Sequence, residues 1–173
     1  MSMERALGFG CGILVGLLLV YFLLKWTKKD GTRKCKYDER QELIRGRGFK
    51  YGFFTLIICN FLYASVDVIM DRRMIDSYTG MFSCILVGIL VYISYCIWNG
   101  GYFALNENPK KVLIAFIAIA LLNFGIFAMN LAHGEVMQNG VLTFRVTNLL
   151  CGIMFLAIFA ILLVKKMHDK GEE

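Results

Sequence analysis

The sequence has little charge and almost no proline. Only 18% of its 173 residues are charged and one is proline, whereas 58% are hydrophobic. In a soluble domain of this length, roughly a quarter of the residues are usually charged. The composition therefore indicates a chain that is surrounded by lipid rather than by water.

The motifs of common catalytic and metal sites are also missing. None of the six cysteines forms a C-x-x-C pair, which argues against a zinc or redox site. The sequence has no G-x-S-x-G, Walker or EF-hand pattern, so it lacks the usual nucleophile, phosphate and calcium sites. His133 and His168 are predicted to lie on opposite sides of a membrane and cannot share a metal. We expect no enzymatic activity and no cofactor, and we interpret the cysteines as small apolar packing residues.

The net charge of +6 comes from 19 basic residues, most of which flank apolar runs. Ten of them lie between Lys25 and Lys50, and short loops this rich in Lys and Arg stay on the cytoplasmic side of a membrane. Anionic lipid headgroups and insertion asymmetry account for such residues. The expected partner is therefore the lipid bilayer and not nucleic acid.

Five apolar runs predict an all-α, polytopic membrane helix bundle that forms a single membrane domain. Each run is close to the ~20 residues that cross a hydrocarbon core of ~30 Å. The predicted spans cover residues 6–26, 51–70, 80–98, 112–131 and 142–164, with a cytoplasmic basic loop at 27–50. A four-span chain would need one run to be peripheral. Five spans place fifteen of the 19 basic residues inside, with the N-terminus outside the cell membrane and the C-terminus in the cytoplasm.

The first apolar run contains Gly8, Gly12 and Gly16, which recur every four residues on one helix face. This small-xxx-small spacing lets another backbone approach closely. The partner is either a helix of the same chain or the same face of a second copy. Basic residues follow this run instead of preceding it, which indicates a retained anchor rather than a signal peptide.

Polar residues at membrane depth form a candidate polar cluster. Its members are Asn60, Asp67, Asn123, Asn130, Arg145 and Asn148. One interpretation is structural: Asp67 and Arg145 form a buried ion pair, and the asparagines add hydrogen bonds between helices. The other is an outward-facing polar pocket for a ligand or an ion.

The basic loop carries a candidate cytoplasmic contact surface. Its residues are Asp38, Glu39, Arg40, Gln41 and Arg45. Asp38 and Gln41 have the spacing of a capping box, which predicts a short helix on the membrane surface. Glycines at positions 46 and 48 are expected to interrupt that helix before the chain re-enters the bilayer.

Two motifs in predicted cytoplasmic segments resemble a known pattern. Tyr37–Gln41, followed by Arg45–Phe54, looks like the D-E-R-Q then K-G-x-x-Y pattern of small multi-pass membrane proteins of Gram-positive bacteria. Gly101–Leu105 is similar to their A-Y-F-x-L element, with Gly101 in place of alanine. The resemblance implies membrane class and bacterial origin, and it transfers no catalytic residues.

These observations favour a small membrane protein that acts by binding another membrane component, as an accessory, sensor or immunity-type protein. Its partner would be a membrane protein or a second copy of the chain. The alternative is an oligomeric transporter or channel-like protein with a polar path near Asp67 and Arg145. An intramembrane enzyme that acts on lipid is a third hypothesis.

Overall fold

The computed structural model describes residues 36–70 and 74–171, together with residues 14–15, 18–19, 21–22, 28–29 and 32–33. The chain divides into two compact units, Met1–Lys36 and Tyr37–Glu173. In the first unit, strands β1 (Lys28–Lys29) and β2 (Thr32–Arg33) pair in an antiparallel manner. The predicted packing face of Gly8, Gly12 and Gly16 lies outside the described residues, as does most of the predicted first span.

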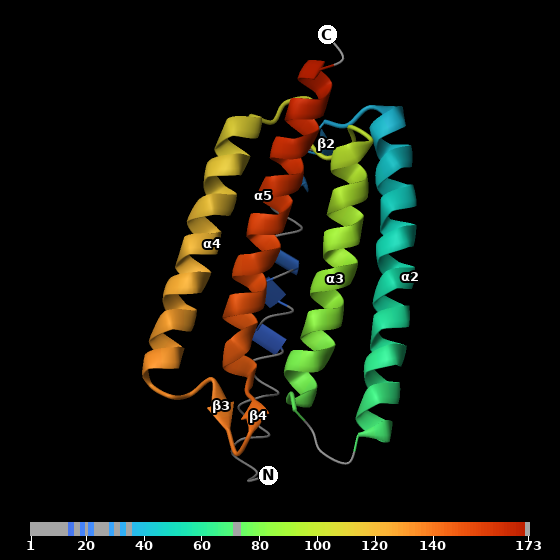
Figure 1. Ribbon diagram of the computed structural model, residues 1–173. Helices are drawn as coiled ribbons and strands as arrows, with labels where there is room; N and C mark the ends of the chain where they lie inside the picture. The colour runs from blue at the N-terminus through green and yellow to red at the C-terminus, as the bar shows by residue number, and fades with distance from the viewer. Residues whose placement is uncertain are drawn as a thin grey trace. The chain divides into compact units, whose positions relative to one another are not determined.

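The second unit consists of four long helices and a small β-hairpin (Figure 1). The helices are α2 (Glu39–Ile69), α3 (Ser77–Trp98), α4 (Pro109–Ala132) and α5 (Thr147–Gly171). Between α4 and α5 lie strands β3 (Met137–Gln138) and β4 (Val141–Leu142) and the short 3₁₀ helix η1 (Phe144–Val146).

Each of these four helices is long and apolar enough to cross a membrane. Their outward faces are apolar as well: Phe61, Ile114 and Leu121 are each at least 66% exposed. Side chains of this kind are stable on the outside of a helix when lipid surrounds it. The predicted helical fold is confirmed for the described residues, four of whose helices are long and apolar enough to span a membrane, and the fifth helix is not confirmed.

The start of α2 differs from the prediction. A separate surface helix that ends near Gly46 was expected, but α2 continues without a break from Glu39 to Ile69. Gly48 is buried against α3, where a Cβ atom would lie 3.0 Å from the Cys96 sulfur and 3.1 Å from the Tyr95 ring. This glycine therefore permits close helix packing rather than a bend.

Local capping residues explain where the helices begin. The capping box at α2 is confirmed, because the Gln41 backbone N–H donates to Asp38 Oδ1 at 2.6 Å and the Asp38 N–H donates to Gln41 Oε1 at 3.3 Å. Asp76 caps α3 in a similar manner by accepting from the Thr79 N–H at 3.0 Å. Pro109 occupies the first position of α4, where a backbone N–H would have no partner within the helix, so the missing N–H of proline costs nothing.

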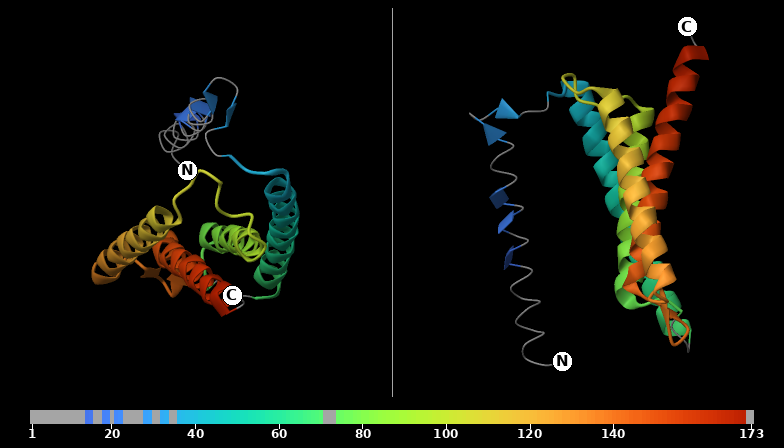
Figure 2. Two further views of the ribbon diagram at one scale, coloured as in Figure 1. Left: turned by 90° about the horizontal axis from the view of Figure 1, so that it is seen from above. Right: turned by 90° about the vertical axis from the view of Figure 1, so that its left-hand side faces the viewer.

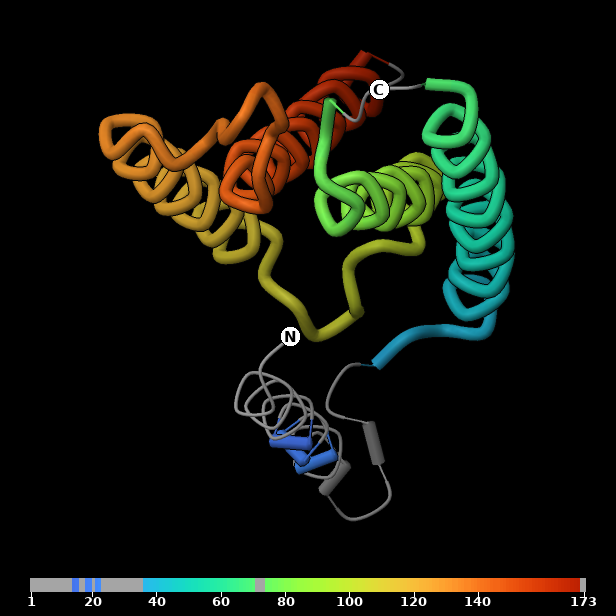
Figure 3. Tube along the Cα trace, turned by 90° about the horizontal axis from the view of Figure 1, so that it is seen from below, coloured from blue at the N-terminus to red at the C-terminus, as the bar shows by residue number. Residues whose placement is uncertain are grey.

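The four helices pack in the order α2, α3, α5, α4 (Figures 1 and 2). The core lies mainly between α3 and α5, where Ile97, Ile158 and Leu162 are buried, and side chains of α4 pack against it. Seen along the helix axes in Figure 3, α3 and α5 separate α2 from α4. The bundle thus consists of two helix pairs, α2 with α3 and α4 with α5. The two pairs contact each other through α3 and α5.

Small residues form the contact between α2 and α3. A Cβ atom on Gly52 would lie 2.7 Å from the Gly88 carbonyl oxygen, and one on Gly88 would lie 2.9 Å from the Gly52 carbonyl oxygen. Cys84 and Cys96, two of the cysteines that were predicted to be small packing residues, are buried on α3 and form no disulfide. The backbones of α2 and α3 thus approach each other closely, as small residues in a helix interface permit.

Candidate functional site

The candidate polar cluster is divided between the two sides of the bundle. Asn60 and Asp67 lie on α2, whereas Asn123 and Asn130 lie on α4, with α3 and α5 between them. The Asn60 amide donates to the Leu56 carbonyl of its own helix at 2.9 Å. The Asn123 amide donates to the Ile119 carbonyl at the same distance. Each of these two side chains therefore donates a hydrogen bond within its own helix, and the hydrogen bond between helices that was expected for Asn123 stays a prediction.

Arg145 has a different carboxylate partner from the one predicted. Its guanidinium lies 2.7 Å from Glu135 Oε2 and donates to Asn130 Oδ1 at 3.0 Å. Among the described residues, the predicted pair with Asp67 is replaced by this local pair. The reason is the helix order: α3 lies between α2 and α5, whereas the β3–β4 hairpin brings Glu135 beside η1.

The hairpin itself is encoded locally. Its turn contains Asn139 at φ 51° and Gly140 at φ 78°, and Asn-Gly is the favoured pair for such a two-residue turn. A pocket of about 460 Å³ at this end includes Asp76, Glu135 and Arg145 in its lining. Arg145 is the one member of the predicted cluster in that lining, and Asn148 lies half-buried on α5.

The two sequence motifs meet at the other end of the bundle, where α2 and α4 begin and α3 and α5 end. We call this the basic end. The Gln41 amide donates to the carbonyl oxygens of Gly100, at 3.2 Å, and Phe103, at 3.1 Å. A Cβ atom on Gly101 would lie 2.7 Å from Ile44 Cγ2. Gln41 of the D-E-R-Q segment thus holds the α3–α4 loop, and Gly101 lies in close contact with Ile44.

The candidate cytoplasmic contact residues have two kinds of environment. Asp38 and Gln41 serve the helix cap, and the Arg45 guanidinium lies 4.1 Å from the centre of the Tyr37 ring. Asp38, Glu39 and Arg40 are exposed at the surface, whereas Gln41 and Arg45 are half-buried. Asp38, Gln41 and Arg45 therefore contribute to internal structure, while an external partner can reach Glu39 and Arg40.

Tyr102, in the same loop, is a packing residue. Burial is the main cause that raises the pKa of Tyr102 to about 12, and the nearby Glu107 carboxylate raises it further. The phenol therefore stays protonated and uncharged at neutral pH. Its ring lies 6.4 Å from the Phe116 ring, centre to centre, and anchors the loop against α4.

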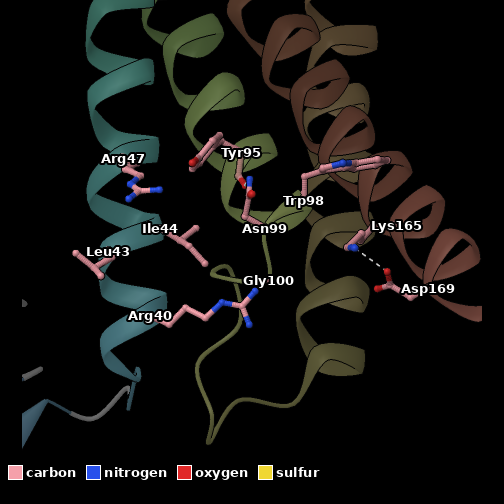
Figure 4. Close-up of a pocket in the computed structure, with 10 residues that line it drawn as sticks. All are labelled: Arg40, Leu43, Ile44, Arg47, Tyr95, Trp98, Asn99, Gly100, Lys165 and Asp169. Atoms are coloured by element: carbon pink, nitrogen blue, oxygen red, sulfur yellow. Dashed lines mark hydrogen bonds and ion pairs between the residues drawn. The ribbon is translucent and has the colours of Figure 1, made fainter. Parts of the chain in front are cut away.

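A pocket of about 610 Å³ opens at the basic end beside this loop (Figure 4). We call it the basic pocket. It is lined by Arg40, Leu43, Ile44, Arg47, Tyr95, Trp98, Asn99, Gly100, Lys165 and Asp169. The lining comes from α2, the end of α3 and the end of α5. One carboxylate, Asp169, stands against three cations, and it lies 2.6 Å from Lys165 Nζ.

Helical spacing places the cations of α2 at this pocket. Arg40 and Arg47 are seven residues apart, about two turns, and so lie on the same face of α2. Gln41 and Gly48 are each one residue further and face the α3–α4 loop and α3. Figure 4 shows Arg40 extending from α2 toward Gly100, and Lys165 joined to Asp169 on α5. The cations together form a site suited to a negatively charged group.

Of the residues that line the basic pocket, Arg40 was predicted from the sequence as a contact residue, whereas Arg47, Trp98 and Lys165 were not. The seven-residue spacing of the two arginines is a visible signal, whereas the approach of Lys165 depends on the packing of α5 against α3. Comparison with protein-family models, curated proteins and solved structures finds no match to this chain. The resemblance to the Gram-positive membrane proteins stays a prediction.

Proposed function

We propose that this chain is a small integral membrane protein that works by binding another membrane component, as an accessory, sensor or immunity-type protein, and not by catalysis. The observation that carries the proposal is the basic pocket. Three helices form its walls, and two of them supply three cations against a single carboxylate. A pocket of this composition at the end of apolar helices suits an anionic group of a lipid or of a membrane protein.

The proposed location is a bacterial cell membrane, with the N-terminus outside and the C-terminus in the cytoplasm. The Lys and Arg residues concentrate before α2 and at the end of α5, and such residues favour the cytoplasmic side. In this orientation the basic pocket lies at the level of the inner lipid headgroups, where a membrane component has direct access to it.

The contacts beneath the pocket favour binding by a preformed site. Gln41 holds two carbonyl groups of the α3–α4 loop, and Gly48 lies in close contact with α3. The backbone of α2 that carries Arg40 and Arg47 is therefore held beside the end of α3. A binding site whose walls are already in place loses less conformational freedom on binding than one that must assemble.

The transporter hypothesis has less support. Its polar path would run along Asn60, Asp67 and Arg145, but the first two lie on α2, whereas η1, which carries Arg145, packs against α3, α4 and α5. The Asn60 amide is bonded within α2, and Arg145 is paired with Glu135 near the hairpin. We therefore favour the binding function.

Photo-crosslinking in native membranes tests the proposal. A photoreactive amino acid at Leu43, which is 65% exposed in the lining of the pocket, should form an adduct with the bound component. Adding R40E and R47E to the protein with this photoreactive group should reduce the amount of adduct at least about fivefold. Two positive charges that attract an anionic component become negative charges that repel it. The adduct is measured by mass spectrometry of the purified protein.

The matched control places the same photoreactive group at Phe61, which is 72% exposed on the same helix but far from the pocket. The two charge reversals should leave its adducts with bulk lipid unchanged. If the adduct at Leu43 were equally abundant with and without the charge reversals, the basic pocket would not be the binding site.

A further inference from the structure

We infer that the membrane component is an anionic phospholipid, bound with its phosphate group in the basic pocket and one acyl chain in a groove between α3 and α5. This inference rests on the proposed function and specifies its ligand. It is based on a second hollow, which adjoins the basic pocket and has an apolar lining instead of a charged one.

The second hollow is almost entirely apolar. It has a volume of about 420 Å³ and is lined by Ser94, Trp98, Ala160, Ile161 and Val164. The single hydroxyl in this lining, that of Ser94, donates to the Leu90 carbonyl at 2.6 Å and so needs no further partner. Ser94 and Ala160 are small, which leaves room for a chain between the two helices. We call this hollow the apolar groove.

The apolar groove adjoins the basic pocket and lies nearer to the middle of the bundle along the helix axes. Trp98 lines both. On α5, Ala160 precedes Lys165 by five residues, which is about 7.5 Å along a helix. On α3, Ser94 precedes Asn99 by the same number of residues. The polar lining thus lies nearest the helix ends, and the apolar lining follows toward the middle of the bundle.

The charges at the junction suit a phosphodiester. Lys165 Nζ lies 5.8 Å from the centre of the Trp98 ring, and the His168 ring lies 5.8 Å from the same ring, centre to centre. Asp169 balances one of the three cations, so the pocket keeps an excess of positive charge from Arg40 and Arg47. A tryptophan at such a position is typical of the boundary between headgroups and hydrocarbon.

An adjoining polar and apolar pair of hollows matches a lipid better than a soluble anion. A free phosphate ion would use only the cations and would leave the apolar groove without a role. A phospholipid uses both, because its phosphate reaches the cations while its acyl chain lies beside Ala160 and Val164. The chain leaves one apolar environment for another, so its contribution comes from van der Waals contacts with the lining of the groove.

Native mass spectrometry of the full chain with defined lipids tests this inference. The protein should bind phosphatidylglycerol at least about tenfold more tightly than phosphatidylcholine. Replacing the three cations together (R40Q, R47Q and K165Q) should reduce this preference to about twofold or less. The apparent dissociation constants come from titration of each lipid into detergent-solubilised protein.

The matched control removes three cations from the same two helices but outside the basic pocket: K50Q, K166Q and K170Q. This variant should keep the preference for the anionic lipid. Circular dichroism of both triple variants should show the same helix content, since all six positions are at the surface or only half-buried.

A second arm separates a lipid site from a site for free phosphate. Filling the apolar groove with A160F should weaken phosphatidylglycerol binding at least about fivefold, whereas A118F, at an exposed position on α4, should not. Millimolar inorganic phosphate should fail to displace the lipid.

Three results would overturn the inference. In the first, both triple variants lose the lipid preference equally. In the second, A160F binds the lipid fully and phosphate displaces it. In the third, the parent protein shows no preference for the anionic lipid. A protein adduct at Leu43 together with absent lipid preference would overturn this inference and still support the proposed function.

Discussion

Replacing Gly52 with alanine should separate α2 from α3 and lower the free energy of unfolding by about 1–3 kcal/mol. The added Cβ would lie 2.7 Å from the Gly88 carbonyl oxygen and 2.9 Å from the Tyr92 Cβ. Neither atom is the end of a flexible side chain, so one helix backbone must move away from the other. Membrane helices associate largely through such close packing, and the loss should be visible as a lower thermal midpoint in detergent.

Gly46 provides the matched control on the same helix. A Cβ atom there meets nothing within 4 Å, so Gly46→Ala should be neutral or should stabilise α2 by about 0.5–1 kcal/mol through its higher helix propensity. If both variants melted at the same temperature, close contact between α2 and α3 at Gly52 would be excluded.

Replacing Gln41 with alanine should release the α3–α4 loop from α2. The change removes the acceptor for the Asp38 N–H and both donors to the Gly100 and Phe103 carbonyl groups. Lost capping and hydrogen bonds of this kind cost about 1–3 kcal/mol together. Limited trypsin digestion should cleave after Lys110 at least about fivefold faster, because this lysine directly follows the loop.

Gln41→Glu separates the two roles of the side chain. Glutamate keeps an oxygen that can accept from the Asp38 N–H, but it has no donor and places negative charge against two carbonyl oxygens. It should therefore release the loop at least as much as alanine does.

The control is Thr55→Ala, which removes a hydrogen bond within α2 from the Thr55 hydroxyl to the Tyr51 carbonyl. That change should stay within about 0.5 kcal/mol of the parent protein. Trypsin cleavage of Gln41→Glu at the parent rate would contradict the role of the Gln41 amide as the connection between the two motifs.

Features that depend on neighbouring residues were predictable from the sequence. The capping box of Asp38 and Gln41, the entry of Pro109 into α4 and the apolar helices follow from short patterns. Such patterns involve the backbone within one or two helical turns, so no knowledge of the helix order is needed to recognise them.

The polar contacts were harder to predict because they depend on which helices are neighbours. The prediction that Asp67 and Arg145 pair assumed that their helices touch, whereas α3 lies between them. Glu135 is close to Arg145 in the sequence but separated by the hairpin, and only the turn at Asn139 and Gly140 brings the two together. Depth in the membrane alone therefore does not define a polar cluster.

Glycines illustrate the same limit. Gly46 and Gly48 were predicted to interrupt a helix, yet α2 continues through both. In a membrane helix a glycine often serves close packing, which compensates for its low helix propensity. The distinction between Gly46, which faces open space, and Gly48, which contacts α3, requires the position of the partner helix.

We propose that the helices cross a membrane with the basic pocket on its inner face, and thiol labelling in cells tests this orientation most directly. K170C lies at the end of α5 beside the basic end, and Q138C lies in the hairpin at the opposite end. A membrane-impermeant maleimide should add label to Q138C in intact cells, and to K170C only after the cell membrane is permeabilised, relative to the parent protein. Labelling of K170C but not Q138C in intact cells, or equal labelling of both, would contradict the claim.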